Sequence, residues 1–220
     1  MYTLYIGNKN YSSWSLRPWV LMKNAGIDFL EEKISLYGPG SQARILAASP
    51  SARVPCLHDG KLAIWDSLAI AEYLAERHPG LWPEDAATRA WARSATAEMH
   101  SGFPDLRNQL SMDLRVRTRV QPTPETAANI ARIDAIWREG RQRFGGEGPY
   151  LCGKFCIADA FWCPVAFRFR SYGVEVRGAS ASYLQALLTL PAMIEWDADA
   201  ARETEVLAIP GQPVQPPVQA

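Results

Sequence analysis

The sequence lacks three features that would define its class directly: an excess of charge of one sign, a long apolar run and a dense set of cysteines. Lys and Arg number 23 and Asp and Glu also number 23 among 220 residues, so no net charge attracts nucleic acid or an acidic membrane surface. No apolar run reaches the roughly 18 residues that a membrane-spanning helix needs. The first residues show no basic region followed by an apolar core, so we expect no signal peptide. These absences predict a cytoplasmic protein that binds neither nucleic acid nor membrane.

The four cysteines are too few for a disulfide scaffold in a chain of this length, which fits a reducing compartment. Cys152, Cys156 and Cys163 are separated by three and six residues, and no histidine is close to them in the sequence. A structural zinc site usually contains two closely spaced pairs of ligands. We therefore expect no metal, and buried thiols that pack as small hydrophobic groups.

Strand and helix patterns alternate up to about Pro79. Short apolar runs predict strands, and apolar residues three and four apart predict helices. Asp59-Gly60 between two apolar runs is a strong hairpin signal. A helix between the first two strands implies that these strands are parallel. In order, we expect a strand at Tyr2–Ile6, a helix at Ser15–Asn24, a strand at Phe29–Leu36, a short helix at Gln42–Ala48, strands at Val54–His58 and Leu62–Ile64, and a helix from Asp66 or Ser67 to Arg77.

Beyond residue 85 the pattern is helical only. We expect a helix from Ala86 toward Arg119 with a kink at Pro104, a helix capped by Thr123 that ends near Gly145, and helices at Ile157–Phe169, Tyr183–Leu188 and Pro191–Glu203. The predicted organisation is an α/β domain over residues 1–79, an all-α domain over 86–208 and a flexible Pro- and Gln-rich tail over 209–220.

The segment Tyr11–Pro18 joins the first predicted strand to the first helix and contains a candidate site. Proline has no N–H and clashes with the carbonyl four residues back, so we expect Pro18 in the first turn and Ser12 and Ser13 in the loop or at the cap. A helix N-terminus offers N–H donors and partial positive charge to an anion. Two hydroxyl groups there suit an oxyanion or a thiolate. Alternatively, one serine only caps the helix and the other faces water.

Several motifs, in this order, resemble those of the cytosolic glutathione transferase family. Ser12-Ser13-Trp14-Ser15-Leu16-Arg17 is similar to the Ser-Ser-Cys-x-x-Arg motif of the zeta class, to which maleylacetoacetate isomerases belong. Ser49-Pro50-Ser51-Ala52-Arg53-Val54-Pro55 is similar to Asn-Pro-x-x-x-Val-Pro, Trp65-Asp66-Ser67-Leu68-Ala69-Ile70 to Glu/Asp-Ser-x-Ala-Ile, and Cys156-Ile157-Ala158-Asp159 to a Ser/Thr-x-x-Asp capping box. The resemblance covers nearly the whole chain. It implies an α/β plus all-α fold: a thioredoxin-like βαβ-α-ββα domain followed by an all-helical domain.

The resemblance implies glutathione as co-substrate, without a metal. Pro55 would be cis, and Val54 would pair with the cysteinyl backbone of glutathione. The hydroxyl and N–H of Ser67 would take the γ-glutamyl carboxylate, and Asp66 the ammonium. An ordinary proline at a strand start and a plain helix cap stay open as alternatives. Arg53 and Gln42 would contact the glycyl carboxylate or the nearby backbone of glutathione.

Glutathione chemistry needs a thiolate, because the thiol is a poor nucleophile. A free thiol with a pKa near 8.5 is only a few per cent ionised at pH 7. In the family a Ser or Tyr hydroxyl in the first loop lowers that pKa. Counting back from Arg17, Ser13 occupies the position of the theta- and delta-like serine, and Ser12 that of the first zeta serine. We favour Ser13 slightly, keep Ser12 open, and consider Tyr5 and Tyr11 as third choices.

Trp14 replaces the cysteine of the zeta motif. That change weakens a specific claim of maleylacetoacetate isomerase activity and argues against modes that form mixed disulfides. The leading function is a glutathione transferase or glutathione-dependent isomerase. The alternatives are a binding module on the same fold and a thiol-disulfide oxidoreductase, which would need a cysteine such as Cys56.

The electrophile site is expected on the helical half, facing the serine loop. The candidates are Met99, His100, Phe103 and Arg107. The basic candidates, His100 and Arg107, could bind an acidic substrate, or equally pair with solvent or with Asp105. For the apolar candidates, Met99 and Phe103, plain core packing is an equally good interpretation.

Family resemblance also implies a homodimer with a seam formed by Trp65–Arg77 and the first long helix.

Overall fold

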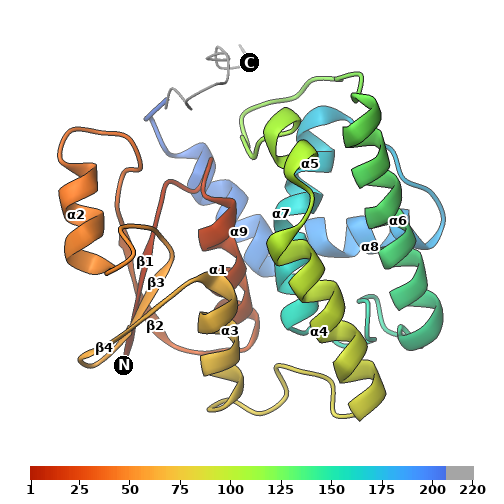
Figure 1. Cartoon of the computed structure of the whole chain (residues 1–220), viewed down its shortest axis with the longest axis horizontal. Helices are drawn as coiled ribbons and strands as arrows, with labels where there is room; N and C mark the ends of the chain where they lie inside the picture. Colours follow the sequence, from red (N-terminus) through yellow and green to blue (C-terminus); the bar gives the residue numbers. More distant parts are fainter. Residues whose placement is uncertain (207–220) are drawn as a thin grey trace.

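A four-stranded mixed sheet forms the N-terminal half of the chain (Figure 1). The computed structural model describes residues 1–206, so the tail predicted from residue 209 onward lies outside the described residues. The strands are β1 (Tyr2–Ile6), β2 (Phe29–Lys33), β3 (Cys56–Asp59) and β4 (Leu62–Trp65). Their order is β2-β1-β3-β4. As predicted, β1 and β2 are parallel and β3 and β4 form an antiparallel hairpin.

Helices lie on both faces of this sheet. Helices α1 (Ser13–Asn24) and α3 (Ser67–Ala75) lie together on one face, and α2 (Ser41–Ala48) lies on the other (Figure 1). Leu4 and Ile6, two residues apart in β1, are fully buried on the same face of the sheet. The burial of Trp19 and Val20 of α1 shows that this helix belongs to the core.

The C-terminal half is helical. Its elements are α4 (Ala86–Ser101), α5 (Pro104–Gln109), α6 (Pro124–Phe144), α7 (Ile157–Tyr172), α8 (Ala179–Leu188) and α9 (Pro191–Ala201). Helix α7 is buried along almost its whole length, because it packs against α1, α4 and α8. No helix within residues 1–206 is long and apolar enough to cross a membrane.

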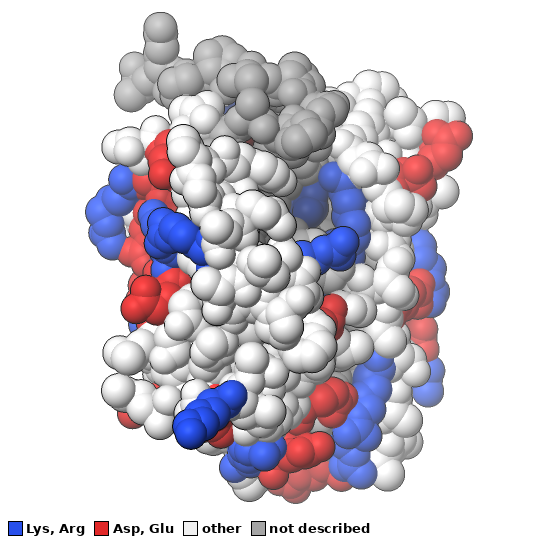
Figure 2. Space-filling view, turned by 60° about the vertical axis from the view of Figure 1, so that its left-hand side comes forward, with Lys and Arg blue, Asp and Glu red and all other residues white. Residues whose placement is uncertain are grey.

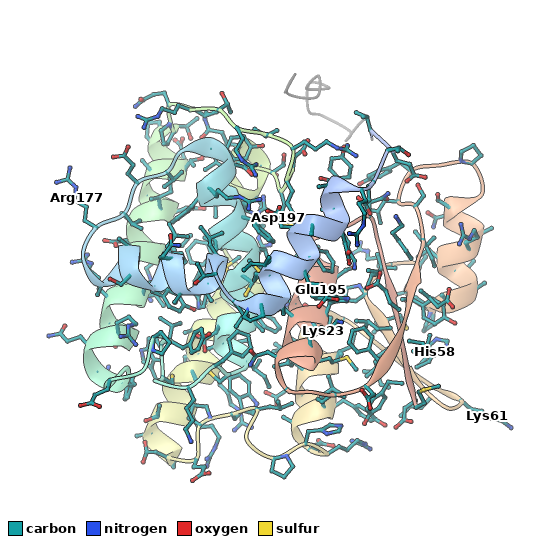
Figure 3. The ribbon with its side chains drawn as sticks, turned by 180° about the vertical axis from the view of Figure 1, so that it is seen from behind. Lys23, His58, Lys61, Arg177, Glu195 and Asp197 are labelled. Atoms are coloured by element: carbon teal, nitrogen blue, oxygen red, sulfur yellow. The ribbon has the colours of Figure 1, made fainter. Side chains whose placement is uncertain are left out.

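One hydrophobic cluster continues from the sheet half into the helical half. The rings of Trp19 in α1 and Trp196 in α9 lie 5.1 Å apart, edge to face. At the surface of the same seam, Lys23 Nζ of α1 lies 2.7 Å from Glu195 Oε1 of α9, and both residues are labelled in Figure 3. Contacts of this kind fix α1, and with it the serine loop at its start, relative to α9.

Helix α1 begins at Ser13, two residues before the predicted start, so the expectation that Pro18 lies in the first turn is wrong. Pro18 is the sixth residue of α1, and the Trp14 carbonyl loses its helical hydrogen bond. An interior proline costs a helix about 3 kcal/mol. The helix continues because its tertiary packing, through buried residues such as Trp19, outweighs this local cost. Ser12 is the N-cap residue, which agrees with its predicted place in the loop or at the cap, whereas Ser13 is already the first residue of the helix.

The helix predicted from Ala86 toward Arg119 ends at Ser101. Phe103 adopts the left-handed conformation with φ of 61°, which interrupts the helical path. Pro104 then starts α5, since a proline at the first helical position gives up an N–H that has no helical partner. The chain from residue 110 to 123 contains no helix. The proline thus begins a second helix instead of bending one long helix.

A buried carboxylate, that of Asp159, caps the start of α7. Asp159 Oδ2 accepts from the Cys156 N–H at 2.9 Å, and Oδ1 accepts from the Leu151 N–H at 3.1 Å and the Tyr183 hydroxyl at 2.9 Å. The capping box between Cys156 and Asp159 is formed. Three donors on one carboxylate therefore support a helix start at which a thiol replaces the stronger acceptor of Ser or Thr.

We expect Asp159→Asn to lower the free energy of unfolding by about 2 kcal/mol or more, because the amide NH₂ group would meet an N–H donor and leave it unsatisfied. Tyr183→Phe removes one donor only and should cost about 1 kcal/mol. Urea unfolding of both variants measures this ranking. Equal stability of Asp159→Asn and wild type would contradict the role given to the carboxylate.

Candidate active site

The loop between β1 and α1 is held by the end of α9 and the residues that follow it. The N–H groups of Lys9 and Asn10 donate to the Glu203 carboxylate at 2.7 and 3.1 Å. Lys9 Nζ also contacts Asp199 Oδ2 at 2.5 Å. These contacts fix the backbone that leads into Ser12, so the two serines have defined positions.

The two serines at the start of α1 have different hydrogen bonds. The Ser12 hydroxyl donates to Ser15 Oγ at 2.7 Å, and Ser15 Oγ also accepts from the Gly7 N–H at 3.1 Å. Ser13 Oγ instead accepts from Arg168 Nη2 at 3.3 Å, and its own proton has no acceptor among residues 1–206. A hydroxyl has one proton to donate. Ser13 can donate it to a ligand, whereas Ser12 already donates to Ser15.

The peptide bond between Val54 and Pro55, just before β3, is cis. Among residues 1–206, neither the N–H nor the C=O of Val54 has a hydrogen-bond partner. Unpaired backbone groups of this kind are suited to an extended peptide that adds alongside a strand.

Asp66 and Ser67 form the start of α3. Asp66 Oδ1 caps the helix by accepting from the Leu68 N–H at 2.8 Å, and Asp66 Oδ2 lies 3.3 Å from His100 Nε2. Asp66 has φ of 73°, a conformation that is costly for a residue with a side chain and that clusters at functional sites. Ser67 is buried, and its hydroxyl accepts from Arg17 Nη1 at 3.2 Å. A small cavity of about 120 Å³ is lined by Trp14, Ser51, Arg53, Val54, Pro55, Trp65, Asp66 and Ser67.

Arg17 lies behind this small cavity with no exposed surface. Its Nη1 also contacts His100 Nδ1 at 3.3 Å. Its guanidinium carbon lies 4.1 Å from the centroid of the Trp14 ring and 4.8 Å from that of Phe161. Burial lowers the pKa of Arg17 well below its usual range. Within the described part of the chain, residues 1–206, its Nε and Nη2 have no hydrogen-bond partner, so aromatic faces provide much of its environment.

A main cavity of about 500 Å³ opens beside Ser13, and the walls that residues 1–206 give it carry three arginines and no carboxylate. Burial lowers the pKa of Arg107 to about 10 and, together with repulsion from Arg107, that of Arg168 to about 9, so both stay protonated at neutral pH. The face shown in Figure 2 has a hollow bordered by Lys and Arg side chains. This cavity favours an anionic group. Its lining comprises Tyr11, Ser12, Ser13, Trp14, Leu36, Tyr37, Gln42, Ile45, Ala52, Arg53, Val54, Arg107, Asn108, Ser111, Met112 and Arg168.

The predicted glutathione contacts surround these two cavities. Pro55, Asp66 and Ser67 line the small cavity, and Gln42 lines the main cavity. Arg53 and Val54 line both, so the two cavities adjoin. Of the third-choice tyrosines, Tyr11 lines the main cavity and Tyr5 packs its ring against His58.

The predicted electrophile contacts are divided between cavity and core. Arg107 lines the main cavity, where it also donates from Nε to the Gly102 carbonyl at 3.0 Å. Met99 is fully buried and Phe103 packs against Trp162, so both belong to the core. His100 lies between Arg17 and Asp66 and contacts Ser67 only indirectly, through Arg17.

The sequence pattern did not indicate Arg168. Its neighbours Phe167 and Phe169 are typical of a core helix, and both are buried. The only available signal was a charged residue between two aromatic ones, which indicates a buried charge but not its partner.

His100 gives the site a pH-dependent contribution to stability. Burial lowers the pKa of His100, and this effect outweighs the attraction of Asp66. The unfolded chain therefore takes up this proton more readily than the folded one, and stability falls as the pH drops through about 6.5. We expect the urea midpoint of His100→Asn to fall less than that of wild type between about pH 7.5 and about pH 5.5. Parallel pH profiles of the two proteins would contradict this assignment.

Comparisons with known proteins agree on one family. A family model described as the glutathione S-transferase N-terminal domain matches residues 11–77. A probable maleylacetoacetate isomerase of Caenorhabditis elegans is 33% identical over 107 residues, 48% of this chain and 49% of that protein, so the chain matches about half the length of that relative. The maleylacetoacetate isomerase of Rattus norvegicus is 34% identical over 161 residues, 71% of this chain and 69% of that protein.

A solved structure shows the same fold over nearly the whole chain. It is a glutathione transferase homologue from Burkholderia with bound glutathione, with a TM-score of 0.67 and 24% identity, and the match covers 92% of this chain and 99% of that one. Together with the extent of the rat match, these findings show that the chain belongs to the glutathione transferase family.

Proposed function

We propose that this protein binds glutathione and stabilises its thiolate through the Ser13 hydroxyl, for conjugation to, or glutathione-dependent isomerisation of, a small electrophile. The observation that carries the proposal is the Ser13 proton, which has no acceptor among residues 1–206 and lies beside a cavity with three arginines and no carboxylate. A thiolate is the anion that such a donor and such a field favour.

The two cavities fit the two ends of a tripeptide thiol. The unpaired backbone groups of Val54 are proposed to pair with the cysteinyl backbone of glutathione. Ser67, at the N-terminus of α3, is proposed to bind the γ-glutamyl carboxylate and Asp66 the ammonium. Arg53 and Gln42 line the main cavity and are proposed for the glycyl end.

The chemistry requires a moderate stabilisation of the thiolate. Lowering a thiol pKa from about 8.5 by about two units corresponds to about 2.7 kcal/mol. A hydroxyl hydrogen bond to an anion together with the N-terminus of α1 is a sufficient source for much of it. The thiol proton leaves to water, and the sulfur lone pair then attacks the electrophile.

Isomerisation is a second reaction of the same site. The two relatives described above bear the name maleylacetoacetate isomerase, in one case as a probable one, and the name denotes an acid. The arginines of the main cavity support an acidic electrophile, with Arg107 as the contact that the sequence predicted.

A thiol-disulfide oxidoreductase has less support. Cys56 is fully buried in β3, and burial raises the pKa of its thiol, which lowers its thiolate fraction. Trp14 occupies the position in the serine motif where a reactive cysteine would lie.

The test is a titration of bound glutathione, followed by the ultraviolet absorbance of its thiolate. We expect Ser13→Ala to raise the thiol pKa by about one unit or more toward the free value near 8.5, with little change in glutathione affinity. Ser12→Ala is the matched control and should have the smaller effect, because the Ser12 proton is donated to Ser15.

A larger effect of Ser12→Ala would transfer the role to Ser12. If wild type and both variants bind glutathione without forming its thiolate, the result would favour the alternative of a binding module. Absence of binding would overturn the proposal as a whole.

We also propose a homodimer. An open, mostly apolar groove of about 620 Å³ follows β4 and α3, and Trp65 in it is 47% exposed. Large exposed apolar surfaces of this kind favour association. We expect Trp65→Glu to weaken self-association by about 2 kcal/mol or more in sedimentation experiments. Leu46→Glu on α2, at an apolar residue that is 57% exposed, is the control. An unchanged dimer in Trp65→Glu would place the seam elsewhere.

A further inference from the structure

Arg168 is a buried cation without a carboxylate partner. Its residue is 4% exposed, and its guanidinium donates from Nη1 to the Leu110 carbonyl and from Nη2 to Ser13 Oγ at 3.3 Å. Its Nε is buried and has no hydrogen-bond partner in the part of the chain that the structure describes. No Asp or Glu within residues 1–206 is among the groups that act on its charge.

Arg170, two residues later on α7, has a carboxylate partner, which is the usual arrangement for an arginine with little exposure. Its two terminal nitrogens bind both carboxylate oxygens of Asp197 at 2.6 and 2.7 Å. Asp197 is labelled on α9 in Figure 3. The same helix thus places one arginine against a carboxylate and the other against neutral acceptors. A buried charge without a counter-ion is costly, and an anion that enters the main cavity offsets that cost.

The groups that face Arg168 keep the cavity positive. Arg107 of α5 repels it, and the Tyr172 hydroxyl of its own helix opposes this effect. Burial and Arg107 lower the pKa of Arg168 to about 9, which leaves it protonated at neutral pH. At the pH where a glutathione thiolate must form, Arg168 therefore carries its full charge.

The hydrogen bond between Arg168 and Ser13 also has a direction. Nη2 donates and Ser13 Oγ accepts, so the Ser13 proton must point away from the guanidinium. A hydroxyl that accepts from a cation is a better donor in turn, because hydrogen bonds in series polarise one another. The arrangement prepares Ser13 to donate to an anion.

We propose that Arg168 is a positioning residue for the glutathione thiolate: it orients the Ser13 hydroxyl toward the sulfur and supplies a positive charge that favours thiolate over thiol. This role rests on the proposed function. The only bond that breaks in this step is S–H, and the proton goes to water.

The experiment compares Arg168→Met, Arg168→Lys and the control Arg170→Met, by ultraviolet titration of bound glutathione and by glutathione affinity. We expect Arg168→Met to raise the thiol pKa by about one unit, a tenfold loss of thiolate at pH values below that pKa. Arg168→Lys keeps the charge and should restore part of the shift. Arg170→Met should leave the thiol pKa at the wild-type value.

The pH profile of kcat/KM separates this role from a structural one. Arg168→Met should lose about tenfold at neutral pH and recover at alkaline pH, where the thiol ionises without help. A loss that is the same at every pH would overturn the proposal, as would a raised KM for an acidic electrophile with an unchanged thiol pKa. If Arg168→Met does not fold, the thiol pKa of Arg168→Lys decides the question. A shift smaller than that of Ser13→Ala but larger than that of Arg170→Met supports the proposal. A thiol pKa equal to that of Arg170→Met overturns it.

The double variant Ser13→Ala/Arg168→Met tests the route through Ser13. We expect its thiol pKa shift to be smaller than the sum of the two single shifts, because the groups act as a unit. Fully additive shifts would overturn the orienting role. Failure of wild type to ionise glutathione would instead refute the proposed function, so the two failures are distinguishable.

Discussion

The guanidinium groups of Arg17 and Arg168 are buried and that of Arg107 is partly buried where the sheet half meets the helical half, and none of the three forms an ion pair with a carboxylate of residues 1–206. Arg17 lies against the rings of Trp14 and Phe161. Arg107 donates to carbonyls at the end of α4, and Arg168 to the Leu110 carbonyl and Ser13. Dipoles and aromatic faces stabilise a cation without neutralising it, whereas an ion pair would cancel the field. The positive field beside the Ser13 proton follows from this choice of partners.

The site needs both halves of the chain, because neither half contains all its parts. Helix α1 provides Ser13, and α7 provides the arginine that donates to it. The two helices pack directly on one another within one hydrophobic cluster. Glu203 and Asp199 then fix the loop that precedes α1. Precise placement of a hydroxyl relative to a cation is what such rigid support provides.

Local sequence signals predicted much of the fold, whereas features that depend on contacts between distant residues were not predicted. Strand β1 was predicted to the residue, and the Thr123 cap of α6 was predicted because its signal lies within one helical turn. The start of α1 was misplaced because its packing outweighs the cost of Pro18, and packing is not a local property. The break at Phe103 was missed for a similar reason, since a left-handed phenylalanine has no sequence signal. Arg168 is 155 residues from Ser13, so their contact in the candidate site could not be predicted from spacing.

The sequence left Ser12 and Ser13 open, and the distinction follows from where each proton goes. Ser12 donates within its own loop, to Ser15, which in turn binds the Gly7 N–H, so its hydroxyl holds the loop together. Ser13 receives a hydrogen bond from a distant helix, and its own proton has no acceptor among residues 1–206, which supports the proposal that it donates to a ligand. Trp14, beside them, extends its ring over Arg17 and Arg107, with 4.1 and 4.8 Å between ring centroid and guanidinium carbon. A cysteine at this position would add a second thiol to the site. The tryptophan instead adds an aromatic face that stabilises two cations, which supports the proposed chemistry on a ligand thiolate over chemistry on a protein disulfide.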